Sequence, residues 1–421
     1  MKAPRRAAFG ASRLGAPATL HTDTLRMLIV ALAASLFAVV AVAGAVALRM
    51  ARRIVTPSRR IPDTRIVDID IPAQTITLAR TADTVLPGRY GLFTSGSSEY
   101  LKVGSVLASD DTTVKRKLLT QVSGQSTLEP QAAFSGWYYE RPEELHLPFT
   151  VEQIPAAIGS CPAWLFPAPN GDDSAEQTWV IQVHGRGTTR AECLRAVPVF
   201  HALGLTTLVV SYRNDGDAPR TRAGAYALGA TEWRDVDAAI TWALRHGADR
   251  IVLMGWSMGG AIALQTSLGS AHRERIGGVI LDSPVVDWRT VLSYQAKALR
   301  VPTAVTGLAL GALGSDWTTS MTGADGAIHF DRLDMVARAA ELRHPLLILH
   351  SDDDGFVPSS ASHRLAELRP DLVELQVFRT ARHTKLWNYD QQRWTDTIGD
   401  WLRAHDLVAA AATAPADEGE R

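Results

Sequence analysis

The hydrophobic and polar residues of this 421-residue chain change their pattern twice, which divides the chain into three zones. The first zone contains one unbroken apolar segment near the N-terminus. The second zone, residues 65–149, alternates apolar and polar residues over short stretches, as half-buried strands do. In the third zone, residues 150–408, short apolar runs alternate with longer amphipathic stretches, which predicts strands that alternate with helices.

The apolar segment of the first zone is MLIVALAASLFAVVAVAGAVAL, residues 27–48, and it has no charged residue. A helix of about 20 apolar residues crosses a bilayer, whereas the apolar part of a signal peptide usually has roughly 7–15. The segment has no polar face, unlike the surface helix of a soluble domain. We therefore expect a membrane anchor after a basic tail at 1–26. A signal peptide cleaved near AVA at 45–47 is the alternative.

The charges beside this segment bear on its orientation. Basic residues precede it at 2, 5, 6, 13 and 26, and follow it at 49, 52, 53, 59, 60 and 65. The two sides are nearly balanced, but short basic tails stay in the cytoplasm while long domains translocate with little regard to charge. The expected location is the cell membrane, with a single pass and with the large domain at 150–408 outside the cytoplasm.

The second zone has the character of a small β-rich unit. A basic linker with Pro57 and Pro62 is expected at 49–64. After it come the strand-like stretches RIVDIDI, QTITLA, YLKVGSVLAS and TVKRKLLTQV, separated by turn-prone stretches such as LPGRYG and TSGSSEY. The unit shows no catalytic constellation. We interpret it as a support or docking module, with substrate gating as a hypothesis.

The third zone predicts an α/β fold. Strand-like WVIQVH, LTTLVVSY, RIVLMG, GGVILDS, PLLILHS and LVELQVF alternate with helical patterns, which predicts a mostly parallel sheet with helices on both faces. A partly helical insertion is expected at about 286–340. Its stretch 307–314 suggests either an acyl pocket or a packed helix. Residues 409–421 are expected to be a disordered tail.

One predicted strand ends at a serine between two glycines. In IVLMGWSMGGAIA, residues 251–263, the apolar run ends at Gly255, and a helical pattern follows Ser257. A nucleophile elbow has this form, because the sharp turn needs small residues on both sides of the serine. G-x-S-x-G alone is common by chance, so Ser257 needs partners in the later loops.

Those partners are expected in a fixed chain order, first an acid and then a histidine. Strand PLLILHS opens into three aspartates, of which Asp354 is our choice because the loop turns after it, with Asp352 and Asp353 as alternatives. His383 follows the last strand, shortly before a helix expected from about Asp390. The base that activates a serine occupies this position.

An oxyanion hole requires two backbone N–H groups near the nucleophile. The residue after the serine, Met258, supplies one, and the loop HGRG after the first parallel strand supplies the other, which we assign to Arg186. A dinucleotide-binding loop is the rival interpretation of HGRG. It fails because the third glycine of G-x-G-x-x-G is absent.

Together, HGRG, YALGATEWRDVDAAITWAL, GWSMGG, DGFVP and HTKLWN resemble the α/β-hydrolase superfamily, within it the bacterial membrane-anchored hydrolases of the BEM46-like and serine aminopeptidase-like branch. The resemblance covers about 160–405. It implies a Ser257–Asp354–His383 triad with Arg186 and Met258 as oxyanion donors, and neither a metal nor an organic cofactor. Ser351 departs from the His-Gly of many members.

The composition limits the kinds of binding partner that we expect, but it does not identify the substrate. The net charge of −1 gives no signal for nucleic-acid binding. Cys161 and Cys193 form no metal-binding spacing, and either a disulfide or two free thiols fits them. We expect a serine hydrolase that cleaves carboxylic esters of small-molecule or lipid-like acyl groups. The alternatives are a peptidase that binds a free amine through Glu232 or Asp215, and an inactive membrane-tethered scaffold.

Overall fold

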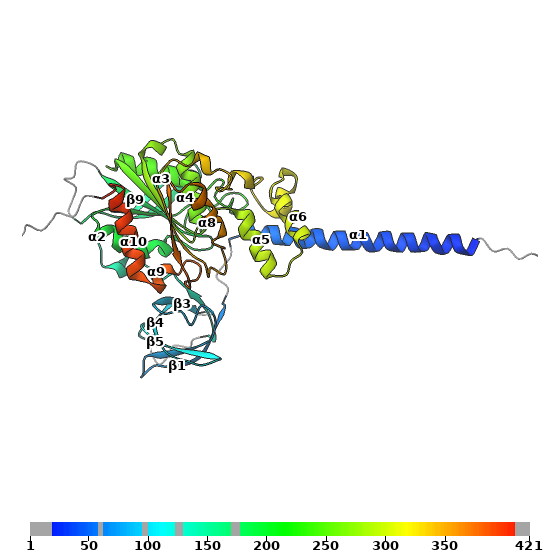
Figure 1. Ribbon diagram of the computed structural model, residues 1–421, viewed down its shortest axis with the longest axis horizontal. Coiled ribbons are helices and arrows are strands. Elements are labelled where there is room, and N and C mark those ends of the chain that lie inside the picture. The colour runs from blue at the N-terminus through cyan, green and yellow to red at the C-terminus, as the bar shows by residue number, and fades with distance from the viewer. Residues whose placement is uncertain (1–18, 58–61, 95–99, 123–128, 170–176, 409–421) are drawn as a thin grey trace, which may run out of the picture.

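The computed structural model describes residues 19–57, 62–94, 100–122, 129–169 and 177–408. It shows a long N-terminal helix, a small barrel and a larger sheet domain (Figure 1). The tail expected at 409–421 and most of the basic tail expected at 1–26 lie outside the described residues.

The apolar segment forms one continuous helix, α1 (Thr19–Val55), which projects away from the sheet domain (Figure 1). Its part Thr24–Val55 is long and apolar enough to cross a membrane, a property that anchors share with signal sequences. Side chains 24–42 are exposed, whereas Ala47, Ala51 and Val55 are buried against the rest of the protein. The helix thus continues into the expected linker, because its last turns have an apolar face that packs.

The second zone folds into a closed antiparallel barrel with strand order β1-β2-β5-β4-β3-β6. The strands are β1 (Thr64–Asp70), β2 (Thr75–Ala79), β3 (Tyr90–Thr94), β4 (Tyr100–Ser109), β5 (Thr113–Leu118) and β6 (Gln131–Ser135). Four of them match the strand-like stretches of the sequence. Strand β3 begins inside LPGRYG, which predicted a turn. The glycine there serves close packing, since a Cβ on Gly91 would lie 2.1 Å from the carbonyl oxygen of Trp137.

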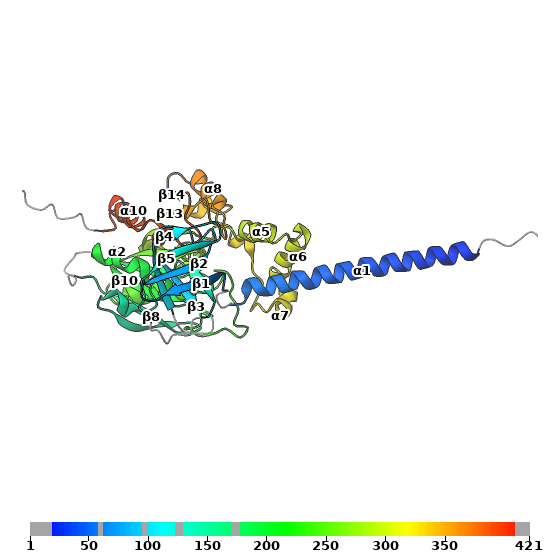
Figure 2. The same ribbon diagram turned by 90° about the horizontal axis from the view of Figure 1, so that it is seen from below.

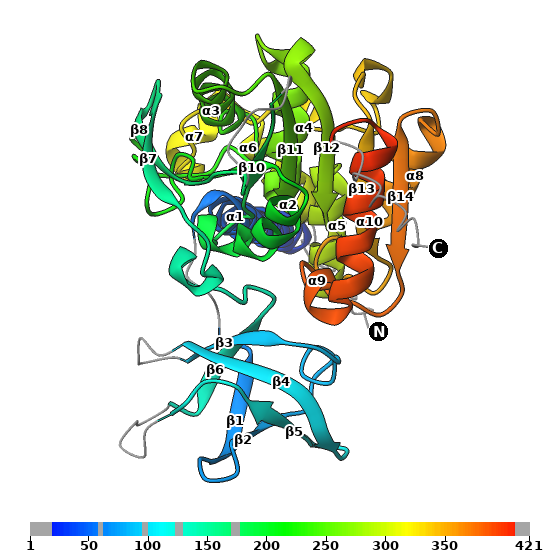
Figure 3. The same cartoon turned by 90° about the vertical axis from the view of Figure 1, so that its left-hand side faces the viewer.

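The third zone contains an eight-stranded sheet with the order β14-β13-β12-β11-β9-β10-β8-β7 (Figure 3). The parallel part comprises β9 (Thr178–Val183), β10 (Thr206–Val210), β11 (Arg250–Trp256), β12 (Ile276–Asp282), β13 (Leu346–Ser351) and β14 (Val373–Phe378). The antiparallel edge comprises β7 (Thr150–Ala156) and β8 (Gly159–Phe166). The mostly parallel sheet confirms the predicted fold class.

Helices cover both faces of this sheet. One face packs against α3 (Trp233–Arg245), α4 (Met258–Gly269) and α8 (Ser360–Leu368), and the other against α2 (Val197–Ala202), α9 (Leu386–Tyr389) and α10 (Gln391–Ala404). Alternate residues of β11 enter the two cores: Ile251 and Leu253 join one, while Val252 and Met254 join the other. Burial on both sides explains why β11 is almost entirely apolar.

Short 3₁₀ turns are distributed along the chain, at η1 (Pro142–Leu145), η2 (Arg190–Ala196), η3 (Arg273–Arg275), η4 (Asp316–Thr318), η5 (Phe330–Arg332) and η6 (Ala339–Glu341).

The insertion contains the helices α5 (Trp288–Ala298), α6 (Thr303–Leu313) and α7 (Thr319–Thr322). Helix α6 packs along α1, so of the two alternatives for stretch 307–314 the structure shows the packed helix. Helix α7 also packs against α1, and Figure 2 shows both helices beside it.

The two cysteines are separate free thiols. Cys161 on β8 and Cys193 in η2 are both buried, and they belong to the cores on opposite faces of the sheet.

Candidate active site

Ser257 lies at a sharp turn between β11 and α4, as the sequence predicts. Its backbone has φ 52° and ψ −115°, a conformation that a non-glycine residue rarely adopts. Three hydrogen bonds of 3.0 Å hold it: its N–H donates to the carbonyl of Asp282, and its carbonyl accepts from the N–H groups of Gly260 and Val285. Strained residues persist where their surroundings fix them in this way, and such residues concentrate at functional sites.

The two glycines of the motif are required sterically. A Cβ on Gly259 would lie 2.2 Å from the carbonyl oxygen of Val183, at the end of β9. A Cβ on Gly255 would lie 2.3 Å from the carbonyl oxygen of Gly259. The G-x-S-x-G spacing therefore follows from the close approach of β9, β11 and α4.

The structure brings the three predicted side chains together at the carboxyl ends of β11, β13 and β14. His383 Nδ1 lies 2.7 Å from Asp354 Oδ2, and His383 Nε2 lies 3.0 Å from Ser257 Oγ. An ionised carboxylate only accepts hydrogen bonds, so Nδ1 carries the proton. Nε2 is then free to accept the proton of the Ser257 hydroxyl, the arrangement that a base needs in order to activate a serine.

Asp354 is held as an ionised carboxylate. Its Oδ1 accepts hydrogen bonds from the N–H groups of Phe356 and Val357, both at 2.8 Å. Burial raises the pKa of Asp354, but His383 and His350 lower it further, and the net result is a pKa well below the ordinary range. The carboxylate therefore stays charged wherever the protein is folded near neutral pH.

The alternative aspartates lie apart from His383. Asp352 accepts hydrogen bonds from Ser359 and His363, and its side chain is 48% exposed. Asp353 contacts Arg382 at 3.2 Å. Of the three aspartates, the structure thus places Asp354 beside the histidine.

His350 is a partner of Asp354 that the sequence reasoning missed. Its Nε2 lies 3.0 Å from the carbonyl oxygen of Val357, which fixes the proton on Nε2, and 3.4 Å from Asp354 Oδ2. Its Nδ1 accepts from the hydroxyl of Ser362 at 2.8 Å. A buried histidine at the end of a strand, four residues before the acid, was the available signal.

The loop expected to supply an oxyanion donor passes directly beside the serine. A Cβ on Gly185 would lie 3.4 Å from Ser257 Cβ. The loop is fixed by Glu192, whose Oε2 accepts the N–H of Gly185 at 2.8 Å and the hydroxyl of Thr188 at 2.9 Å. Arg186 follows Gly185 in this loop. Glu192 itself gave no signal in the sequence.

Met258, the other expected donor, is the first residue of α4. The first N–H groups of a helix have no acceptor within the helix, and they carry the positive end of its dipole. An oxyanion beside Ser257 would lie at this helix end.

The side chain of Arg186 points to a different part of the molecule. Its guanidinium donates to the carbonyl oxygens of Arg53 at 2.7 Å and Thr56 at 3.4 Å, at the end of α1. Burial lowers the pKa of this guanidinium from its ordinary value. The loop beside Ser257 is therefore tied to the root of the N-terminal helix.

The barrel contacts the loop that carries His383. Asp83 of the barrel pairs with Arg382 at 3.1 Å and with Lys385 at 3.4 Å, on both sides of the histidine. The side-chain amide of Asn388 donates to the carbonyl of Arg89 at 2.7 Å. These contacts fit a supporting module better than a separate docking domain.

Asp83→Asn tests this support. We expect kcat to fall about tenfold with little change in KM, because small displacements of a catalytic group cost rate rather than binding. Steady-state kinetics on a soluble ester would measure both constants. Asp68→Asn, on the exposed part of β1, is the matched control. An unchanged kcat for Asp83→Asn would show that the ion pairs do not position the loop.

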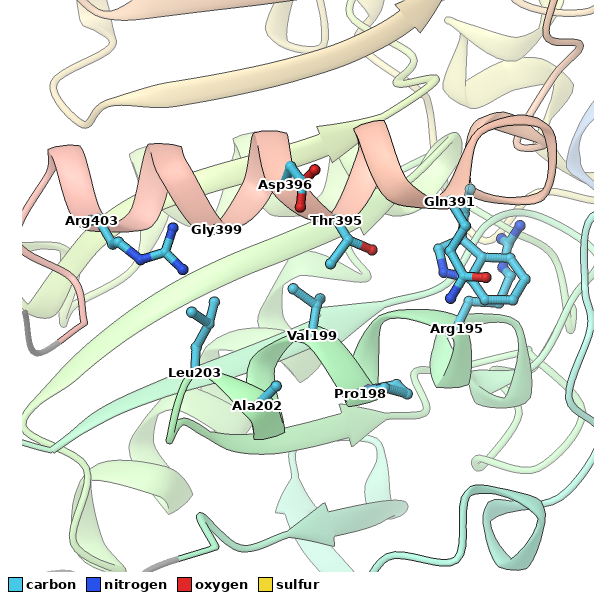
Figure 4. A pocket seen from close by; sticks show the side chains of 11 residues that line it. Arg195, Pro198, Val199, Ala202, Leu203, Gln391, Thr395, Asp396, Gly399 and Arg403 are labelled. Atoms are coloured by element: carbon cyan, nitrogen blue, oxygen red, sulfur yellow. The ribbon is translucent and has the colours of Figure 1, made fainter. Parts of the chain in front are cut away.

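A cavity of about 300 Å³ lies elsewhere, between α2 and α10 (Figure 4). Arg195, Leu203, Thr395 and Arg403 are among its lining residues, and none of the lining residues belongs to the Ser257 site. Among the residues that the structure describes, no group of three or more His, Cys, Asp or Glu side chains is arranged to hold a metal ion.

The parallel sheet, with its strand-to-helix turn at a serine, defines a serine hydrolase of the α/β-hydrolase fold, as the sequence predicted. Residues 196–406 match the family model described as the prolyl oligopeptidase family, and the chain belongs to that family. The barrel, at residues 65–135, matches a domain of unknown function, DUF8805.

The solved structures that resemble this chain include two described as esterases and a protein named Est1E. An esterase from Pyrococcus furiosus is 19% identical, with a TM-score of 0.49, over 63% of this chain and 94% of that chain. Esterase 2 from Thermogutta terrifontis is 17% identical, with a TM-score of 0.45, over 62% and 96% of the two chains. Est1E from Butyrivibrio proteoclasticus, bound to ferulic acid, is 15% identical, with a TM-score of 0.47, over 61% and 99%.

Proposed function

We propose that this chain is a membrane-anchored carboxylic-ester hydrolase in which Ser257, His383 and Asp354 form the catalytic triad. The observation that supports this best is the unbroken hydrogen-bonded series from Ser257 Oγ through His383 to Asp354, at 3.0 and 2.7 Å. The geometry matches what nucleophilic acyl transfer requires of a serine, a base and an orienting acid.

In the proposed reaction, Ser257 Oγ attacks the ester carbonyl while its proton passes to His383 Nε2. The tetrahedral intermediate collapses, the C–O bond to the alcohol breaks, and His383 returns the proton to the departing alkoxide. Water, deprotonated by His383, then attacks the acyl-enzyme and releases the acid and free Ser257. Asp354 keeps the proton of His383 on Nδ1 throughout and stabilises the imidazolium.

The oxyanion of each tetrahedral intermediate is assigned to the backbone N–H groups of Met258 and Arg186. A preorganised donor of this kind contributes roughly 3–4 kcal/mol to the transition state. The position of Gly185 supports the assignment, since a Cβ there would lie 3.4 Å from Ser257 Cβ and the loop therefore passes beside the serine.

A serine peptidase is the second candidate, and membership of the prolyl oligopeptidase family favours it. A peptidase that recognises a free amine needs an available carboxylate. Asp215 and Glu232 do not suit this role, because both are buried and bound to their own loops. Asp215 contacts His184 Nε2 at 3.1 Å and accepts the N–H of Ala218, while Glu232 accepts those of Ala227 and Gly229.

A substrate panel separates the two candidates. We expect turnover of p-nitrophenyl acyl esters, and no preference for an Xaa-Pro anilide with a free amine over its N-acetylated form. In an amine-recognising peptidase the N-acetylated substrate would leave the recognising carboxylate buried and unpaired, at a cost of about 3 kcal/mol or more, so the free amine would be preferred by roughly 100-fold. Such a preference, with slow ester turnover, would favour the peptidase.

The membrane part of the proposal concerns α1. We propose that it is an uncleaved anchor with its N-terminus in the cytoplasm and residues 65–149 and 150–408 as extracytoplasmic domains. One observation supports an anchor over a signal cleaved near 45–47: Ala43 and Ala47, which such a cleavage would remove, pack against the rest of the protein. A mature protein found in membranes with residues 27–48 intact would support it.

A further inference from the structure

The length of α1 places part of the insertion near the membrane. Residues 27–42 carry no charge and their side chains are exposed, and at 1.5 Å per residue they span about 24 Å. The hydrocarbon core of a bilayer is about 30 Å thick. The free part of the helix is therefore too short to cross it by roughly 6 Å, the difference of those two lengths.

The missing length must come from residues 43–48. Extending the span in the other direction would bring Arg26 into the hydrocarbon, at a cost of roughly 2.5–3.5 kcal/mol. Residues 43–48 are where α1 begins to pack: Ala43 and Ala47 join the core that contains Val305 and Ala309 of α6. Helix α6 consequently lies at the depth of the outermost hydrocarbon and the headgroups.

The composition of α6 suits this depth. No charged residue occurs from 301 to 315. One face of α6 packs against α1, and the remaining surface is open: Leu308 is 53% exposed, and nothing lies within 4 Å of a Cβ added at Gly307 or Gly311. A helix that is apolar all round normally lies inside a protein or in lipid.

The segments on either side of α6 carry further exposed apolar side chains. Trp317, in η4, is 95% exposed, and Leu299 and Met321 are also exposed. Tryptophan is enriched where a membrane meets water. The first charged residue of α1 after the apolar segment is Arg49, and Arg52 lies beside Gly323, just after α7. Basic side chains, which suit lipid headgroups, therefore lie close to the end of α7.

We propose that α6 and the segment through Met321 form a membrane-contacting surface, embedded in the interfacial layer of the bilayer that α1 crosses. Amphipathic elements in this layer are buried about 5–10 Å, a depth that agrees with the length of α1. The occupant of this apolar surface is thus lipid. The insertion also reaches the candidate site, since Gln295 of α5 donates to the carbonyl of Phe356, whose ring lies 5.2 Å from that of His383.

Depth-dependent quenching tests the surface without reference to catalysis. Single cysteines at Leu308, Leu36 and Leu107 of the full chain would be labelled with an environment-sensitive dye and reconstituted in phosphatidylcholine–phosphatidylglycerol vesicles that contain doxyl lipids. The native thiols Cys161 and Cys193 are buried, and the unsubstituted chain measures their background labelling. Leu107 of β4 matches the 53% exposure of Leu308. In Figures 1 and 2, β4 lies farther than α6 from the projecting half of α1.

The three positions give distinct outcomes. We expect strong quenching by mid-chain doxyl groups at Leu36, quenching by shallow doxyl groups at Leu308, and none at Leu107. Quenching at Leu36 with a Leu308 label that behaves like Leu107 would overturn the proposed surface. If the label at Leu36 were not quenched, α1 would not cross the bilayer and the proposed surface would be wrong. Ester hydrolysis measured on the same samples tests the catalytic proposal separately.

Discussion

Ser257→Ala is expected to lower kcat for ester hydrolysis by roughly 10⁶-fold, the loss seen when a triad nucleophile is removed. The physical reason is that His383 Nε2, 3.0 Å from the hydroxyl, has no other nucleophile at this position to activate. Covalent labelling by a fluorophosphonate probe should disappear completely. Steady-state hydrolysis of a p-nitrophenyl ester by purified protein and gel labelling of membranes would measure the two effects.

Ser257→Gly separates the loss of chemistry from a loss of folding. A residue at φ 52° is strained unless it is glycine, so this variant should be as inactive as alanine and at least as stable in thermal unfolding. Ser105→Ala, at an exposed position of β4, should label like the native protein. If Ser257→Ala kept its probe labelling while folded, another nucleophile would have to carry the reaction.

The parts of the fold that the sequence predicted are those in which the local pattern and the tertiary environment agree. Strands β9 to β13 are buried on both faces, so their apolar runs are nearly continuous and easily recognised. The same holds for the site. Ser257 and Asp354 each follow such a strand, and His383 follows the edge strand β14. The carboxyl ends of these parallel strands meet at one edge of the sheet.

The parts that escaped prediction depend on contacts between residues far apart in the chain. Gly91 resembles a turn residue, but it is a strand residue whose missing side chain admits the carbonyl of Trp137. Glu192 and Asp83 resemble ordinary surface acids in the sequence. Their roles become visible only when Glu192 binds the loop beside Ser257 and Asp83 binds Arg382.

These contacts also explain how the accessory parts relate to the site. The barrel holds the loop of the proposed base through Asp83, and α1 meets the loop of the proposed oxyanion donor through the guanidinium of Arg186. Two of the loops that form the site thus have fixed points outside the sheet domain. We infer that removing either accessory part would affect the geometry of the site as well as its location.

Asp354→Asn is expected to lower kcat by roughly 10⁴-fold, the effect of imposing the wrong tautomer on a triad histidine. The hydrogen bonds to the N–H groups of Phe356 and Val357 dictate the orientation of the new amide, because only its oxygen accepts them. The amide NH₂ then faces His383 Nδ1, which has to accept a hydrogen bond. The proton moves to Nε2, and Nε2 no longer accepts the proton of Ser257.

The matched control is Asp352→Asn, an identical change two residues earlier on a half-exposed side chain. This variant should keep kcat within a factor of about two, because surface ion pairs contribute little.

The pH dependence of unfolding gives a second measurement. The folded-state pKa of Asp354 lies below its ordinary value of about 3.9, so this carboxylate stabilises the fold above that pH and loses the contribution as the pH falls further. The Asp354→Asn variant should therefore lose less stability than the native protein as the pH falls. The Asp352→Asn variant should lose nearly as much stability in acid as the native protein does. Equal kcat losses in the two variants would show that Asp354 has no special place beside His383.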